Sequence, residues 1–195
     1  MKRFLLIFIF TGAIFPNAFS QRQTQSIGLR IGDPFGFTYK VYMRNHSAIE
    51  WNAGIAFNNW NSRYYRKSFE RDNPGLYYYG HNVDFAWALQ GRFLKHYRFP
   101  DEADVRGLTW FWGFGGQYRM ATIEYIYQTQ LGVGEIFKRN EINYDLGLEI
   151  LAGSEYEIPE VPLIAFLELG LFGEIVDDPV KVRFQTAIGI RYIFK

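Results

Sequence analysis

The sequence contains no cysteine. Disulfide bonds are therefore excluded as a source of stability, and so is a lipid anchor on a cysteine that follows a signal. The chain also lacks an excess of charge of either sign, because 21 Lys and Arg residues stand against 20 Asp and Glu residues. This balance gives no general attraction to nucleic acid, which we exclude as a partner.

Long apolar runs are absent after the first twenty residues. The longest uncharged runs, residues 51–62 and 107–118, stop at twelve residues. A transmembrane helix needs roughly 18 or more. Both runs also contain Gly or Asn at intervals, and these residues form helices poorly. The sequence therefore predicts no membrane-spanning helix in the mature chain.

The N-terminal region has the three parts of a secretory signal. Two basic residues come first, an apolar run fills residues 4–15, and Ala18-Phe19-Ser20 forms a small-x-small cleavage site. A retained membrane anchor is the alternative, but the processing site and the missing stop-transfer flank favour cleavage. We predict a cleaved signal over residues 1–20 and one mature domain over residues 21–195, with 19 basic and 20 acidic residues.

The end of the chain alternates between two kinds of side chain. One face of this segment is large and apolar and ends in two aromatic residues, whereas the other is small or charged. A strand of this length crosses a bilayer when it is tilted, and the small, charged face is typical of the inside of a barrel immersed in lipid. The apolar face holds Phe184, Thr186, Ile188, Ile190, Tyr192 and Phe194, and the other holds Gln185, Ala187, Gly189 and Arg191.

The same alternation recurs along the mature chain and predicts an all-β fold, an eight-stranded antiparallel up-and-down transmembrane β-barrel. An even strand count brings both termini to one side, which for this class is the periplasm of the cell outer membrane. Long loops over residues 58–80 and 121–140 would then face outward. The second has a strand-like stretch at 123–127, for which a strand extending above the membrane is the alternative. The expected strands are residues 26–32, 37–44, 48–57, 82–97, 108–120, 142–153, 163–172 and the closing strand.

Charged residues on these strands fall on the inward faces in this register, and the lipid faces between the interfaces have none. A charge on the lipid face costs about 2–4 kcal/mol at the midplane, and a charge in a narrow lumen needs a partner. Because eight strands leave room mainly for side chains, we predict a plugged, salt-bridged lumen and no metal cluster. Its predicted members are Arg30, Lys40, Arg92, Arg183 and Arg191 with Glu50, Asp84, Asp145, Glu149 and Glu168.

The first long loop mixes basic and aromatic residues over residues 63–72. Guanidinium groups pair with phosphate in a bidentate way, so this loop is a candidate surface contact for lipid or glycan headgroups. A solvated loop with interfacial aromatics is the alternative. The basic residues concerned are Arg63, Arg66, Lys67 and Arg71.

Some eight-stranded barrels modify lipid A, so a catalytic triad has to be considered. Such a site needs His, Ser and an acid together at the outer rim. His46 and His96 fall near the inner end of the barrel, and His81 at the outer rim has only the loop residues Ser62 and Ser68 as neighbouring serines. We therefore expect no enzyme, no catalytic residue and no cofactor.

Three short stretches resemble those of a known class. Residues 28–34, 36–40 and 189–194 are similar to segments of small outer-membrane β-barrel proteins of Bacteroidetes-type bacteria and, more loosely, of OmpX/OmpA-like eight-stranded barrels. The resemblance implies an integral outer-membrane protein in contact with outer-membrane lipid. It also implies a closing strand recognised by the barrel assembly machinery, although Lys195 follows the terminal aromatic residue here.

The function expected from these features is structural, accessory or surface-interacting, with the long outer loops meeting a protein partner. Two other classes remain open, a small-solute porin-like channel and a lipid A-modifying enzyme. A soluble lipocalin-like barrel is a further alternative, and it predicts that the large apolar side chains point inward.

Overall fold

The computed structural model describes residues 24–57, 62–99, 105–129, 135–176 and 182–194. The predicted signal over residues 1–20 lies outside these ranges. No helix in the described part of the chain is long and apolar enough to cross a membrane.

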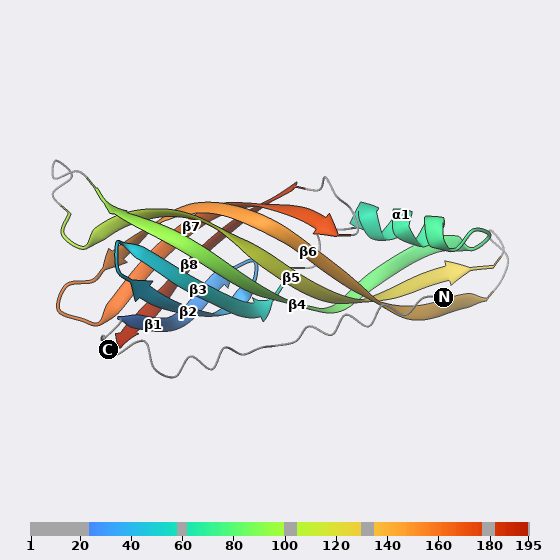
Figure 1. The fold of residues 1–195 in the computed structure, drawn as a ribbon. Helices are drawn as coiled ribbons and strands as arrows, with labels where there is room; N and C mark the ends of the chain where they lie inside the picture. The colour runs from blue at the N-terminus through green and yellow to red at the C-terminus, as the bar shows by residue number, and fades with distance from the viewer. Residues whose placement is uncertain (1–23, 58–61, 100–104, 130–134, 177–181, 195) are drawn as a thin grey trace, which may run out of the picture.

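Eight antiparallel strands close into a barrel in chain order, and the first strand pairs with the last (Figure 1). This confirms the predicted eight-stranded up-and-down fold. One helix lies beside the barrel's long strands. The elements are β1 (Gln25–Gly32), β2 (Phe35–Met43), β3 (Ser47–Ile55), α1 (Ser62–Asp72), β4 (Tyr77–Arg98), β5 (Leu108–Gln128), β6 (Ile136–Glu157), β7 (Leu163–Val176) and β8 (Val182–Phe194).

The barrel is apolar outside and polar inside. On neighbouring positions of β1, the side chain of Leu29 is 61% exposed and that of Arg30 is 1% exposed. The same contrast separates Ile49 from Glu50 on β3. A soluble barrel has the opposite arrangement, so the lipocalin-like alternative is wrong for this chain. An apolar exterior around a charged interior is the arrangement of a barrel immersed in lipid.

Three strands are about twice as long as a membrane crossing requires. β4, β5 and β6 have 22, 21 and 22 residues, whereas about 9–11 residues span a bilayer. The pairing of β3 with β4 stops at Trp87, and that of β6 with β7 stops at Leu146. The three strands therefore continue beyond the closed ring as a three-stranded sheet.

Helix α1 covers one face of this extension. Its side chains Tyr65 and Phe69 are four residues apart, so they lie on one side of the helix, and both are buried in a cluster with Ile123 and Tyr125 of β5. We call α1 together with residues 77–86 of β4, 121–128 of β5 and 136–144 of β6 the platform. It lies at the end of the barrel opposite to Gln25 and Phe194, which are paired with each other (Figure 1).

The platform corrects the long loop predicted over residues 58–80, whereas the strand-like stretch at 123–127 does extend a strand beyond the ring. Residues 58–80 include a helix and the start of β4, and residues 121–140 include the end of β5 and the start of β6. Many of the polar residues that indicated loops are on the exposed faces of these elements, beyond the closed ring.

Candidate functional site

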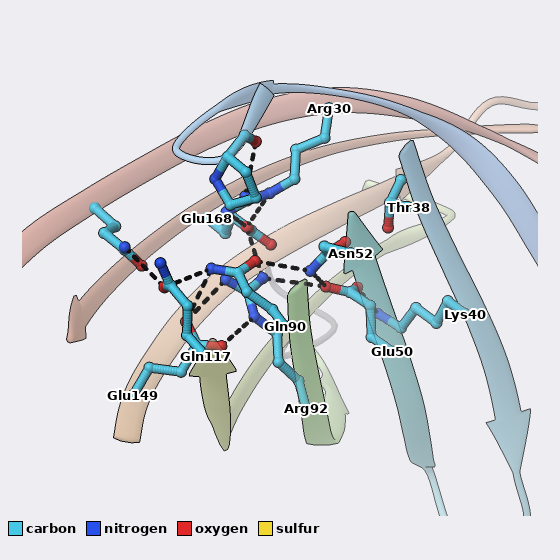
Figure 2. Close-up of polar contacts among 12 residues, drawn as sticks. Arg30, Thr38, Lys40, Glu50, Asn52, Gln90, Arg92, Gln117, Glu149 and Glu168 are labelled. Atoms are coloured by element: carbon cyan, nitrogen blue, oxygen red, sulfur yellow. Dashed lines mark hydrogen bonds and ion pairs between the residues drawn. The ribbon is translucent and has the colours of Figure 1, made fainter. Parts of the chain in front are cut away.

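Four cations and four carboxylates fill the middle of the lumen. Figure 2 shows most of these side chains converging from different strands, with the dashed contacts that join them. The relative exposure of each side chain is 5% or less. We call this set the central network, and it consists of Arg30, Lys40, Arg92 and Arg191 with Glu50, Glu149, Glu155 and Glu168.

Arg92 of β4 joins three carboxylates. Its Nε donates to Glu149 Oε1 at 2.8 Å and its Nη2 to Oε2 at 3.0 Å, which makes a bidentate pair. Its Nη1 donates to Glu50 Oε1 at 3.1 Å and to Glu168 Oε1 at 2.8 Å. Glu168 also accepts from Arg30 Nε at 2.8 Å. One guanidinium thus connects β4 with β3, β6 and β7.

Arg191 of β8 closes the network on the other side. Its Nη2 donates to Glu50 Oε2 and its Nη1 to Glu155 Oε1, each at 2.6 Å. Lys40 Nζ lies 2.5 Å from the same oxygen of Glu155. The guanidinium of Arg191 also stacks on the ring of Phe166 at 3.7 Å, a cation–π contact that desolvation strengthens.

A chain of side-chain amides crosses the lumen beside the central network. Asn52 Nδ2 donates to Gln90 Oε1 at 3.2 Å, and Gln90 Nε2 donates to Gln117 Oε1 at 3.0 Å (Figure 2). Gln185 Nε2 reaches the same oxygen of Gln117 at 2.9 Å. With these amides, all eight strands contribute a polar side chain to one connected set of contacts.

Two smaller ion-paired groups lie nearer the platform. Arg183 Nη2 lies 3.1 Å from both Asp145 Oδ2 and Glu174 Oε2. Arg119 Nη2 lies 2.6 Å from Asp33 Oδ2, in the turn between β1 and β2. Each cation is thus paired at the level where it is buried, as a charge in a low-dielectric lumen requires.

The structure places nine of the ten predicted lumen residues inside the barrel, all buried. The prediction for Asp84 is wrong, because its side chain is exposed. The pairing of β4 with β5 shifts between Val83 and Phe85, so Asp84 is the extra residue of a β-bulge. A bulge changes the face on which each preceding residue of the strand lies.

Three buried charges were missed by the sequence reasoning. Arg119 follows Gln117 by two positions on β5 and therefore shares its inward face. Glu155 and Glu174 lie where β6 and β7 continue beyond the predicted ends. The same period of two, continued, identifies all three. With Asp84 removed and these added, the described lumen holds six buried Arg and Lys residues against six buried Asp and Glu residues.

Buried layers without charge lie on both sides of the central network. Ala48, Leu94, Phe111 and Leu151 pack toward the end that holds the barrel's first and last residues. Ala56, Ala86, Ala88 and Ala121 pack toward the platform. Glu155 reaches past the first of these layers, because it also lines a cavity of about 440 Å³ with Tyr42 and His96 near the start of β1.

The basic residues of the predicted surface contact lie on α1. Arg66 Nε donates to Glu70 Oε1 at 2.8 Å, and this hydrogen bond raises the pKa of Arg66. Arg71 pairs with Asp72 at 2.9 Å, and its hydrogen bond lowers the pKa of Asp72. Lys67 is exposed. Arg63 is in the helix, but its side chain lies outside the described residues.

The candidate catalytic groups do not come together in the described part of the chain. His81 Nδ1 lies 2.5 Å from the hydroxyl of Tyr78, and its ring packs on Tyr65 at a centroid distance of 5.3 Å. Burial lowers the pKa of His81. Ser68 Oγ instead contacts Asp72 Oδ2 at 3.4 Å. Among the described residues no group of three or more His, Cys, Asp or Glu side chains is arranged to hold a metal ion.

Solved structures with this architecture come from bacterial outer membranes. The N-terminal β-barrel domain of Pseudomonas aeruginosa OprF matches 89% of this chain and 98% of its own, at 11% identity and a TM-score of 0.52. A major outer membrane protein of Thermus thermophilus matches 89% of this chain and 100% of its own, at 10% identity and a TM-score of 0.50. The chain has the fold of an eight-stranded outer-membrane β-barrel. No protein-family model and no curated protein sequence matches it.

Identities of 10–11% show the fold of the outer-membrane barrel alone. The wall of eight strands is what this chain shares with these structures. The central network and the platform are formed by residues of this chain, and its function depends on them and not on the shared fold.

Proposed function

We propose that the chain is an integral outer-membrane barrel with a closed lumen that serves as a rigid support for the platform, and that it is not an enzyme. The platform meets a partner outside the membrane. One observation carries the proposal: β4, β5 and β6 continue well beyond the ring and there gain a covering helix. A barrel that only spanned the membrane would not need this second, separately packed unit.

The orientation belongs to the same proposal. The first residue of β1 and the last residue of β8 pair with each other at the end opposite to the platform. In up-and-down barrels of the outer membrane this end faces the periplasm, so the platform faces outward. We also propose that the aromatic end of β8 is recognised by the barrel assembly machinery during insertion. The chain would then be related to the OmpX/OmpA-like barrels of Bacteroidetes-type bacteria.

The lack of cysteine makes the orientation straightforward to test. Lys67→Cys on α1 and Val161→Cys in the turn between β6 and β7 place single exposed thiols at opposite ends of the barrel. A membrane-impermeant maleimide should label the first in intact cells and the second only after the outer membrane is permeabilised. The reverse pattern would show that the platform faces the periplasm.

Two measurements separate this proposal from the other function classes. The purified barrel should give no steady conductance in planar bilayers, because the charged side chains of the lumen are ion-paired. Expression of the barrel should leave the mass of lipid A unchanged. Steady conductance would favour the small-solute channel, and a lipid A mass shift would favour the enzyme.

A contact of α1 with anionic lipid or glycan headgroups is proposed on one observation, the exposed position of Arg66 and Lys67 on the helix. Changing Arg63, Arg66, Lys67 and Arg71 together to Ser should abolish binding of lipopolysaccharide by barrels in zwitterionic nanodiscs. Lys138→Ser with Arg139→Ser is the matched control, because these two cations lie on the platform but on β6. Equal binding by all three proteins would remove the headgroup contact from the proposal.

A further inference from the structure

Two glycines lie side by side on the outer surface of the barrel. Gly91 of β4 and Gly116 of β5 are direct partners in the strand register. Both lie on the lipid-facing side, because Leu89 and Phe93 of β4 and Phe114 of β5, two positions away, are exposed. Two adjacent side chains are thus missing from a surface that consists mostly of large apolar groups.

Six large side chains surround this gap. Along the register, Trp51 of β3 precedes Gly91 and Leu148 of β6 follows Gly116. Along the strands, the cross-strand pair Leu89 and Tyr118 lies on one side of the gap, and the pair Phe93 and Phe114 lies on the other. The depression has a volume of about 860 Å³, and its rim consists of Trp51, Leu89, Phe93, Phe114, Tyr118 and Leu148.

We propose that this depression, the glycine pocket, holds an acyl chain segment of a membrane lipid in a defined position. Apart from the hydroxyl of Tyr118 and the indole N–H of Trp51, the rim is apolar, so the ligand chemistry is that of a hydrocarbon chain. The pocket is continuous with the lipid-facing surface of the barrel, where such chains are the solvent. An unfilled pocket would forfeit the dispersion contacts of its lining, and a flexible chain fills it without any change in the protein.

The two glycines differ in what surrounds them. A Cβ atom on Gly91 would lie 2.8 Å from the ring of Trp51, so that ring depends on glycine for its place over β4. A Cβ atom on Gly116 would meet nothing closer than 3.8 Å. A larger side chain at Gly116 therefore fills the glycine pocket without displacing the backbone. The proposal requires only that the barrel faces lipid and is independent of the role proposed for the platform.

The matched control is Gly173 of β7, which is the register partner of Leu148. It also lies on the outer face, and a Cβ atom there would meet nothing closer than 4.0 Å. Because Gly173 does not line the pocket, Gly173→Leu adds the same side chain to the same kind of surface without filling the depression.

The experiment measures tryptophan fluorescence of the full-length barrel in phosphatidylcholine vesicles that contain an increasing fraction of lipid with dibrominated acyl chains, which quench by contact. The fluorescence of Trp51, which lies on the pocket rim, is obtained as the difference between each protein and the same protein with Trp51→Phe. In the unsubstituted barrel and in Gly173→Leu, we expect strong quenching of this signal in fully brominated vesicles, because a chain held in the pocket stays in contact with the ring of Trp51. Gly116→Leu should weaken this quenching, and Gly116→Ala should weaken it by an intermediate amount even if the larger substitution impairs folding.

Two outcomes would overturn the proposal. One is equal quenching of the Trp51 signal in the unsubstituted barrel and in both substitutions at Gly116. The other is a detergent-solubilised dimer, seen by sedimentation, that Gly116→Leu dissociates and Gly173→Leu does not. In that case a second copy of the chain would occupy the pocket instead of lipid.

Discussion

The lumen and the platform are built on the same strands but are packed in opposite ways. Inside the ring, β5 points Gln117 and Arg119 inward, and the outward groups are aromatic. Beyond the ring the same inward face carries Ile123 and Tyr125, which pack under α1. Apolar residues therefore move from the outside of the strand to its inside within a few positions.

The outward face changes in the same place. Phe114 of β5 is exposed within the ring, whereas Glu124 of β5, on the outer face of the platform, pairs with Lys138 of β6 at 2.9 Å. A hydrocarbon surrounding selects apolar exteriors, and water selects apolar interiors. The surrounding solvent, and not the strand itself, therefore decides which face is packed. The position of the reversal marks the boundary of the membrane.

The largest expected effect is in the lumen. Arg92→Ala leaves Glu50, Glu149 and Glu168 without a shared cation. Breaking a buried pair from one side costs about 3–5 kcal/mol, so the midpoint of denaturant unfolding in detergent should fall strongly. A loss below about 1 kcal/mol would mean that water reaches these carboxylates and that the lumen is not closed.

The platform should respond to an apolar deletion in the way that a soluble domain does. Phe69→Ala removes a ring that is 1% exposed and contacts Tyr78, Tyr125 and Tyr127. The cost is about 3 kcal/mol, typical of a buried Phe→Ala change, and hydrogen exchange should increase in α1 and the platform strands. Increased exchange in β1 to β3 would contradict the separation of the two regions.

A smaller effect should distinguish the regions by pH. Burial lowers the pKa of His81 in the folded platform below its usual value. Below the usual value near 6.5, the unfolded platform binds a proton that the folded one does not, so its stability falls as the pH decreases toward the folded pKa. Hydrogen exchange of α1, corrected for the intrinsic effect of pH on exchange, should therefore show weaker protection at about pH 5 than at about pH 7.5. His81→Phe should abolish the difference.

The smallest effect is expected on the surface of α1. Arg66 and Glu70 form an exposed i, i+4 pair, and such pairs contribute little to stability because water screens both charges. Arg66→Ala should therefore change the unfolding midpoint of the barrel within error, in contrast to Arg92→Ala. A large shift would show that Arg66 is held by more than Glu70 and the ring of Tyr78, to which it lies close.

The sequence predicts the ring well because the lipid and the lumen impose a strict period of two. That period places Arg30, Glu50 and Arg191 inside without knowledge of any contact. It fails at Asp84, because a bulge leaves no mark in the alternation itself. The sequence predicts a loop where α1 lies, since this segment is polar on one side and the apolar partners of Tyr65 and Phe69 are far along the chain on β5.

The pairings within the central network were beyond prediction for a related reason. Arg92 contacts carboxylates from three strands, and these distances depend on how the closed barrel staggers its strands. The alternation predicts which residues point into the lumen, but not which of them contact each other. The balance of charges could be predicted because it follows from the cost of burial alone.

In addition to the bulge at Asp84, β4 has a second bulge between Tyr78 and Gly80. Ten residues of β4 therefore run alongside eight residues of β5, from the pair Tyr77 and Gln128 to the pair Ala86 and Ala121. At about 3.3 Å per residue the difference is about 7 Å of chain. Since bulges bend the strand that carries them and increase its twist, the sheet of the platform is curved, and the partner proposed for it would need a matching shape.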